Sequence, residues 1–143
     1  MKKVIVLLIV IWFSGCAPVT GPEKQFQEAA VSVKEKRFKE AAAACNKIMV
    51  DSPDSSLAAD ALFEIALINA NHANPQRDYV QATRTFAEFV KRYPDNRRVD
   101  EARTWISVLK TVQELKKQNE LLNESIEELK QLDIRHEEKR KGK

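Results

Sequence analysis

The first side chain that could carry chemistry is the thiol of Cys16, which ends the segment Phe13-Ser14-Gly15-Cys16. Lys2 and Lys3 open the chain, and ten apolar residues follow them. A positive start, a short apolar run and small residues at its end are typical of a secretory signal peptide. A transmembrane helix needs about 20 apolar residues, so the run predicts a cleaved signal over residues 1–15 and not a membrane span. The membrane anchor is then expected to be a lipid on the Cys16 thiol.

The segment that ends at Cys16 resembles the lipobox of bacterial lipoproteins. In that family the cysteine thiol is acylated, the signal is cut just before it, and the cysteine becomes the first residue of the mature chain. Phe13 stands where the family usually carries an aliphatic residue. Two or more acyl chains attach a protein stably, because each buried CH₂ contributes about 0.8 kcal/mol. The alternative is a signal peptide that contains a cysteine and is cut elsewhere.

The residue after the cysteine indicates which of the two bacterial membranes holds the lipoprotein. In lipoproteins that stay at the inner membrane this residue is an aspartate, whereas here it is Ala17. The resemblance therefore implies the periplasmic face of the outer membrane.

Side chains that could support catalysis or hold a metal are few and scattered. The two histidines, His72 and His136, lie far apart and lack the cysteine or carboxylate spacing of a zinc site. Helix starts and a charged helix face explain the remaining candidates, which are Ser52, Ser55, Ser56, Glu127, Glu128, Glu137 and Glu138. We expect a non-enzyme with no metal and no other cofactor.

Cys45 is the second cysteine of the chain. It lies at helical spacing from Ala41 and Ile48, which predicts a small buried apolar side chain, with a reactive thiol as the alternative. Because Cys16 is assigned to lipid, no disulfide within the chain is expected.

The composition narrows the class of protein. Loss of Lys2 and Lys3 with the signal leaves 22 of the 24 basic side chains against 21 acidic ones, so the nearly neutral mature chain is not expected to bind nucleic acid. No glycine lies between Gly21 and Gly142, which excludes phosphate loops, dinucleotide turns and nucleophile elbows there. Good helix formers dominate instead. The expected fold class is all-α.

The middle of the chain repeats itself with an offset of 41 residues. Each copy has an aromatic residue, an alanine three positions later, a Pro-Asp turn and a further alanine. On a helix the aromatic residue and the first alanine share one face, where the small alanine lets a neighbouring helix approach, and the proline ends the helix. The pairs that we expect to pack the repeats are Phe38 with Tyr79, Ala41 with Ala82, and Ala61 with Ala102.

These features resemble the tetratricopeptide repeats of BamD-like outer-membrane lipoproteins, and the nearest stretch runs from Tyr79 to Asp95. The resemblance covers about residues 26–109 and implies tetratricopeptide-like helical hairpins, about two repeats where BamD has about five. The predicted organisation is a signal peptide at 1–15, a lipidated N-terminus and linker at 16–22, the tetratricopeptide-like domain at 23–110, and a coiled-coil helix with a basic tail at 111–143.

Five helices are predicted, separated by tight turns and by a surface loop over residues 71–76. The loop explains why the offset of 41 residues exceeds the 34 typical of tetratricopeptide units. The predicted helices span residues 23–36, 38–50, 55–72, 77–92 and 97 to about 140.

The last helix carries a seven-residue pattern from Trp105 onward. Apolar residues at its first and fourth positions predict a coiled coil, and a lone asparagine among them favours two parallel strands in fixed register. The predicted core residues are Val112, Leu115, Asn119, Leu122, Ile126 and Leu129, preceded by Trp105 and Val108. The alternative is that the helix up to Leu115 caps the repeats and the rest is a solvated helix. Flanking charges select no partner, so the helix could bind its own copy or another protein's helix.

One functional hypothesis follows from the expected lipid anchor, the repeats and the last helix. We expect an outer-membrane-anchored periplasmic scaffold that binds a protein or peptide partner in envelope assembly or maintenance. An accessory lipoprotein that contacts the periplasmic domain of a sensor kinase is an alternative. The basic end of the chain is expected to be a solvated tail or to contact anionic lipid or cell wall. Its last residue, Lys143, resembles the wall-attachment site of the major murein lipoprotein, which would make the protein a peptidoglycan tether. The expected partners are envelope proteins and the membrane through the lipid, with a homodimer as an option.

Overall fold

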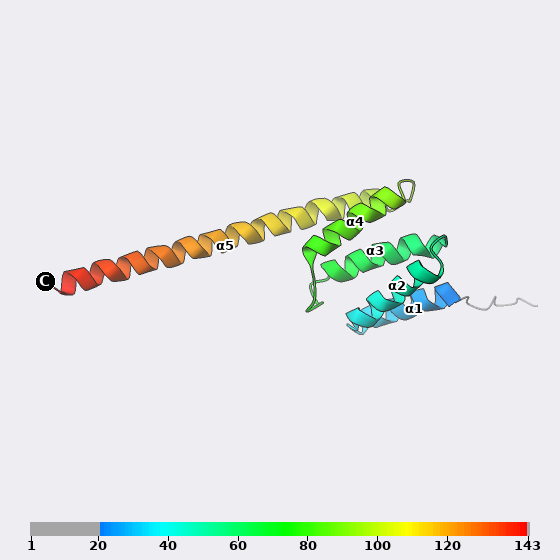
Figure 1. The fold of residues 1–143 in the computed structure, drawn as a ribbon, viewed down its shortest axis with the longest axis horizontal. Helices are drawn as coiled ribbons and strands as arrows, with labels where there is room; N and C mark the ends of the chain where they lie inside the picture. Colours follow the sequence, from blue (N-terminus) through cyan, green and yellow to red (C-terminus); the bar gives the residue numbers. More distant parts are fainter. Residues whose placement is uncertain (1–20, 143) are drawn as a thin grey trace, which may run out of the picture.

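The computed structural model describes residues 21–142, which form five α-helices (Figure 1). The helices are α1 (Gly21–Lys34), α2 (Phe38–Asp51), α3 (Ser56–Ala70), α4 (Tyr79–Arg92) and α5 (Val99–Lys141). The all-α prediction is confirmed, with helical hairpins followed by one long helix. None of the helices in this range is both long enough and apolar enough to cross a membrane. The predicted signal peptide, Cys16 and Lys143 lie outside the described residues.

Each helix packs against the next one along the chain. The contacts join α1 to α2, α2 to α3, α3 to α4, and α4 to α5, and α1 also touches α3. Figure 1 shows the first four helices stacked side by side, while α5 runs along α4 and then continues well beyond the stack. The chain is therefore a short helical stack with one projecting helix.

The start of α1 differs from the prediction. Gly21 and Pro22, predicted as the end of a linker, form the first turn of the helix. A proline in the first turn costs no hydrogen bond, because the first N–H groups of a helix have no partner within it, and its fixed φ suits the helix. The predicted linker therefore ends before Gly21.

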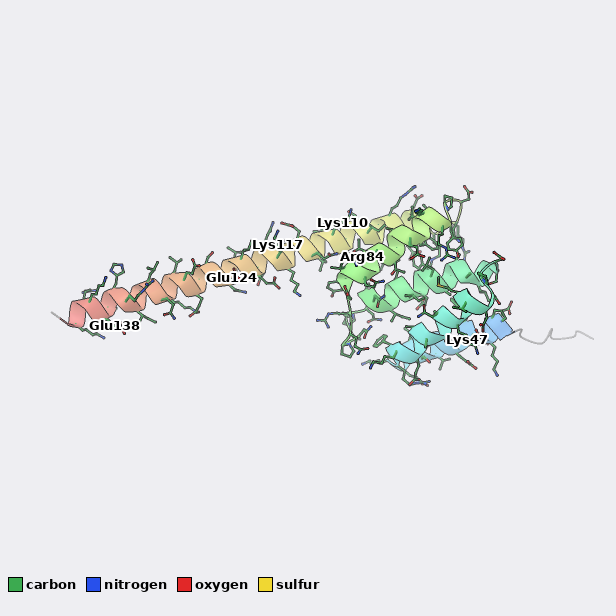
Figure 2. All side chains as sticks on the ribbon, in the orientation of Figure 1. Lys47, Arg84, Lys110, Lys117, Glu124 and Glu138 are labelled. Atoms are coloured by element: carbon green, nitrogen blue, oxygen red, sulfur yellow. The ribbon has the colours of Figure 1, made fainter. Side chains whose placement is uncertain are left out.

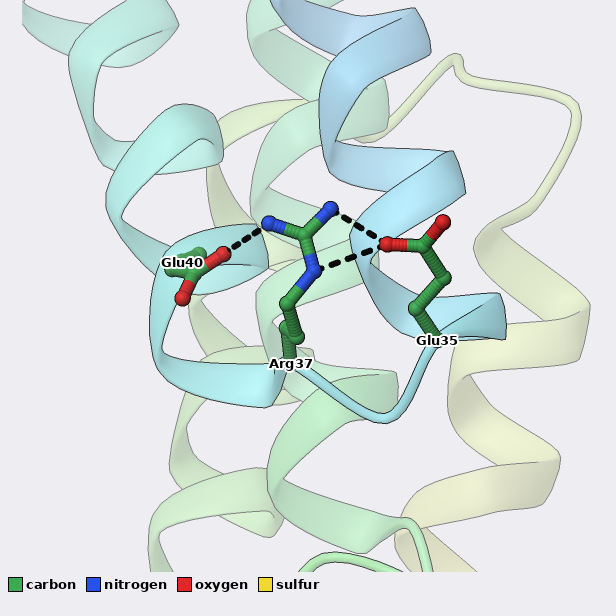
Figure 3. Close-up of polar contacts among 3 residues, drawn as sticks. All are labelled: Glu35, Arg37 and Glu40. Atoms are coloured by element: carbon green, nitrogen blue, oxygen red, sulfur yellow. Dashed lines mark hydrogen bonds and ion pairs between the residues drawn. The ribbon is translucent and has the colours of Figure 1, made fainter.

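The turn from α1 to α2 is centred on Lys36, whose φ is 60°. The Arg37 amide donates to the Ser32 carbonyl at 2.7 Å, and the Lys36 amide donates to the carbonyl three residues before it at 3.0 Å. These two bonds are those of a Schellman turn, in which a left-handed residue closes the helix. The predicted helix end at Lys36 is two residues too late for this reason. Figure 3 shows the Arg37 guanidinium beside the turn, where it donates to Glu35 at 2.8 Å and to Glu40.

An aromatic cluster joins α3, α4 and α5. The ring of Phe63 meets those of Phe86 and Phe89 edge-on, with centroids 5.0 and 5.1 Å apart. Phe86 in turn lies parallel to Trp105 of α5 at 6.1 Å. The Arg98 guanidinium, just before α5, lies 3.4 Å from the centroid of the Phe63 ring. Edge-on ring pairs and cation–π contacts are attractive beyond the apolar area that they bury, so this cluster sets the direction in which α5 leaves the stack.

The six residues predicted to pack the repeats lie in or against the core. Ala41, Ala61, Ala82 and Ala102 are fully buried, and Phe38 is 6% exposed. Tyr79 is half-buried and packs against the cluster that contains Ala82 and Ala102. The alanines therefore stand where neighbouring helices meet.

The loop between α3 and α4 is not wholly at the surface as predicted, because Asn74 is only 5% exposed. Its side-chain amide donates to the Ile68 carbonyl at the end of α3, at 2.9 Å, and its side-chain oxygen accepts from the Gln76 amide at 2.9 Å. The asparagine thereby satisfies a terminal helix carbonyl and a loop amide at once. His72 lies in the exposed part of this loop.

Substitution of Ala82 by tryptophan is expected to lower the free energy of unfolding by about 1–3 kcal/mol, because the added ring has no space between α4 and its neighbours. Ala87→Trp on the exposed side of α4 is the matched control and is expected to change stability little. Thermal or urea unfolding measures both. Equal midpoints for the two variants would contradict the packing role of Ala82.

Candidate interaction sites

Cys45 and the histidines are poorly placed for catalysis. The free Cys45 is fully buried, and burial, followed by the nearby Glu64 carboxylate, raises the pKa of its thiol to about 12. The thiol is therefore protonated at neutral pH, which makes it a weak nucleophile. His72 and His136 are exposed on separate elements. Across residues 21–142 no group of histidine, cysteine and carboxylate side chains is arranged to hold a metal.

The outer half of α5 carries an exposed apolar stripe. We define this stripe as the predicted coiled-coil residues Leu115, Leu122, Ile126 and Leu129, with Asn119 among them; its four apolar members are between 49% and 65% exposed. At about 100° per residue they fall on one face of the helix. Figure 2 shows the labelled Lys117, Glu124 and Glu138 on the same part of α5, beyond the other helices.

The first third of α5 uses a different face to pack on α4. Leu109 is 3% exposed and belongs to the core, whereas Val108, which the seven-residue pattern places in the coiled-coil core, is 47% exposed. Leu109 lies about 120° around the helix from Leu115. The heptad pattern thus does not mark Leu109, which is the residue that meets the stack at this level, while Val108 stays available to a partner helix. Val112, the first predicted coiled-coil residue, is half-buried at the border between the two faces.

Gln113 makes the last polar contact between α5 and α4. Its side-chain amide donates to the Tyr79 carbonyl at 3.3 Å and to the Thr83 hydroxyl at 3.0 Å. Every described residue after it on α5, from Glu114 to Gly142, is exposed. The stripe thus begins where the intramolecular packing ends.

Side-chain pairs within α5 support its helical structure in water. Ion pairs join Lys116 to Glu120 at 3.9 Å and Lys130 to Glu127 at 3.4 Å. The side-chain oxygen of Asn119 accepts from the Asn123 amide at 3.0 Å. Such exposed pairs stabilise a helix by only about 0.2–0.5 kcal/mol each. They do not offset the unfavourable free energy of contact between the apolar stripe and water.

A groove of about 320 Å³ lies between α2 and the α3–α4 loop. Ala42 and Asn46 of α2 form one side of it, and Asn69 and Gln76 form part of the other. Phe38, a predicted packing residue, also lines it. Side-chain amides both donate and accept hydrogen bonds, so the groove presents both kinds of polar group.

A second pocket, of about 410 Å³, lies between α1, α3 and α5. We call it the Glu64 pocket, and it is lined by Val33 of α1, by Glu64, Leu67, Ile68 and Ala70 of α3, by Asn71 and His72 directly after α3, and by Trp105 of α5. Glu64 is half-buried, and burial raises the pKa of its carboxyl, although the positive charge of Arg98 acts in the opposite direction. Sequence reasoning missed this residue, because one glutamate inside an apolar helix has no repeating partner that would mark it.

The comparisons with known proteins leave the resemblance untested. The sequence matches no family model and no curated protein. The lipoprotein and tetratricopeptide-repeat readings therefore remain predictions.

Replacement of Glu64 by glutamine is expected to raise the thermal midpoint at about pH 7 and to have little effect at about pH 4. A carboxyl whose pKa is higher in the folded than in the unfolded state stabilises the fold at low pH and loses that contribution as pH rises through the folded pKa. The glutamine amide is neutral at both pH values, so the variant does not lose stability as the pH rises. Glu124→Gln on exposed α5 is the control. A variant that is destabilised at pH 7 would contradict the assignment.

Proposed function

We propose that this protein is a lipid-anchored scaffold on the periplasmic face of the outer membrane that holds a protein partner through the stripe on α5. The observation that carries the proposal is the exposure of Leu115, Leu122, Ile126 and Leu129 on a helix that projects beyond the stack. Envelope assembly or maintenance is the process in which a scaffold of this kind would act.

Burial of the stripe would release substantial free energy. A large aliphatic side chain contributes about 1.5–3 kcal/mol when it is fully buried, and four of them lie here in one line. An isolated helix without tertiary packing is marginal in water. A partner helix packed along the stripe would remove its apolar side chains from water and would also give this part of α5 tertiary packing.

The direction of α5 suits a membrane-anchored scaffold. A helix of 43 residues is about 65 Å long. Figure 1 shows the far end of α5 on the side of the stack opposite to the start of α1. An anchor at Cys16 would hold the start of α1 near the membrane, and the stripe would then be presented away from it.

A second copy of the chain is the partner that the stripe fits most simply. Two chains anchored in one membrane would place their α5 helices in parallel, and confinement to the membrane raises their effective concentration. In that arrangement Asn119 of each chain meets its counterpart, which favours two strands in register.

Substitution of Cys16 by serine is expected to release the protein from the outer membrane or to leave it held by an uncleaved signal, because the thiol is the proposed site of acylation. Cell fractionation and detection of acyl chains measure the outcome. Cys45→Ala is the control and is expected to keep the lipid, since the Cys45 thiol is buried. A Cys16→Ser protein that still carries acyl chains and floats with outer membrane would refute the anchor.

Substitution of Asn119 by isoleucine is expected to tighten self-association of the soluble chain from Gly21 by about tenfold or more, and to loosen the preference for a dimer, because an apolar side chain replaces an amide in the proposed core. Gln131→Ile adds the same side chain on another face of α5 and serves as control. Sedimentation at several concentrations measures both. If all forms stay monomeric, the stripe takes a different protein.

A further inference from the structure

The Glu64 pocket combines apolar side chains with one carboxylate and with two further polar side chains, Asn71 and His72. Leu67 and Ile68 of α3 belong to its lining, together with Val33 from α1 and Trp105 from α5. Glu64 is the one acidic side chain in that lining. The pocket is separate from the stripe, because Trp105 lies ten residues before Leu115 and on the part of α5 that packs on α4.

The carboxylate of Glu64 has no direct partner. Within residues 21–142 no hydrogen bond or ion pair reaches it at the distances that such contacts require. Arg98 is the cation that influences it, but the Arg98 guanidinium is already held. It donates to Glu101 at 3.0 Å and lies 3.4 Å from the Phe63 centroid, so it is not free to turn toward Glu64.

We propose that the Glu64 pocket binds a lysine or arginine side chain, flanked by apolar residues, from a protein partner. The charged end of that side chain would pair with the Glu64 carboxylate, and its aliphatic stem would lie against Leu67 and Trp105, as long cationic side chains do on apolar surfaces. A hydrogen bond between two charged groups is stronger when both are partly removed from water. The lone negative charge disfavours an anionic ligand, and one carboxylate is too few oxygen ligands for a divalent cation.

Trp105 gives this site a direct fluorescence signal. The chain has two tryptophans, and the other, Trp12, lies in the predicted signal peptide. In the chain from Gly21 Trp105 is therefore the single tryptophan, and its fluorescence responds to the pocket that it lines as well as to its stacking on Phe86. The three core clusters of the described residues are built from side chains between Phe26 and Leu109, so the chain from Gly21 retains every one of them.

The probe is the peptide acetyl-Leu-Arg-Leu-amide, and its neutral match carries citrulline in place of arginine. Both are titrated against the chain from Gly21 and against Glu64→Gln, with Glu124→Gln as the matched control. We expect the arginine peptide to bind about tenfold more tightly than the citrulline peptide. This preference should vanish in Glu64→Gln and persist in Glu124→Gln. Agmatine, which has the guanidinium and a stem but no flanking residues, should bind more weakly than the arginine peptide.

Three results would overturn the proposal. An arginine peptide that binds no better than the citrulline peptide would remove the role of charge. Equal binding to Glu64→Gln would place the peptide elsewhere. Agmatine that binds as tightly as the peptide would assign the pocket to a small cation and not to a protein segment. Because Glu64→Gln is expected to be at least as stable as the parent chain, loss of binding in this variant would not reflect unfolding.

Discussion

The aromatic cluster between α3, α4 and α5 is the interaction on which the candidate surfaces depend. Phe63 contacts two aromatic rings of α4, and one of them, Phe86, stacks in turn on Trp105 of α5. Ring pairs of this kind have preferred distances and angles, so they fix the orientation of α5 as well as its attachment. The direction in which the stripe projects and the wall that Trp105 gives to the Glu64 pocket both follow from this one cluster.

Much of the fold was predictable because its packing follows a regular period. The 41-residue offset located Ala41, Ala61, Ala82 and Ala102, all of which are fully buried. Small side chains at helix contacts and prolines at helix ends act locally, so a sequence displays them directly. The same rules placed the helix ends within two residues of those in the structure.

The features that sequence reasoning missed depend on contacts across the fold. Lys36 adopts a left-handed conformation that is usually taken by glycine, so its residue type did not mark the turn. Asn74 is buried because it reaches the carbonyl of Ile68, six residues away. Val108 and Leu109 are both apolar, and only the packing on α4 decides which of them is buried. A seven-residue pattern identifies an apolar stripe, but a helix that also packs on its own domain has two such faces.

The Glu64 carboxyl is an exception among the charged groups of this protein. Arg37 is paired with Glu35 and Glu40 at exposed positions, and the partly buried Arg98 is paired with the exposed Glu101, so each of these charges has an opposite charge beside it. Glu64 instead lies in a largely apolar pocket without a direct partner, where burial raises its pKa, and its charge lowers stability at neutral pH. An apolar residue at this position would continue the packing of Leu67 and Ile68 without that cost. The charge of Glu64 is unfavourable for folding but becomes favourable once a cation enters the pocket. This energetic pattern is typical of a binding residue and not of a structural one.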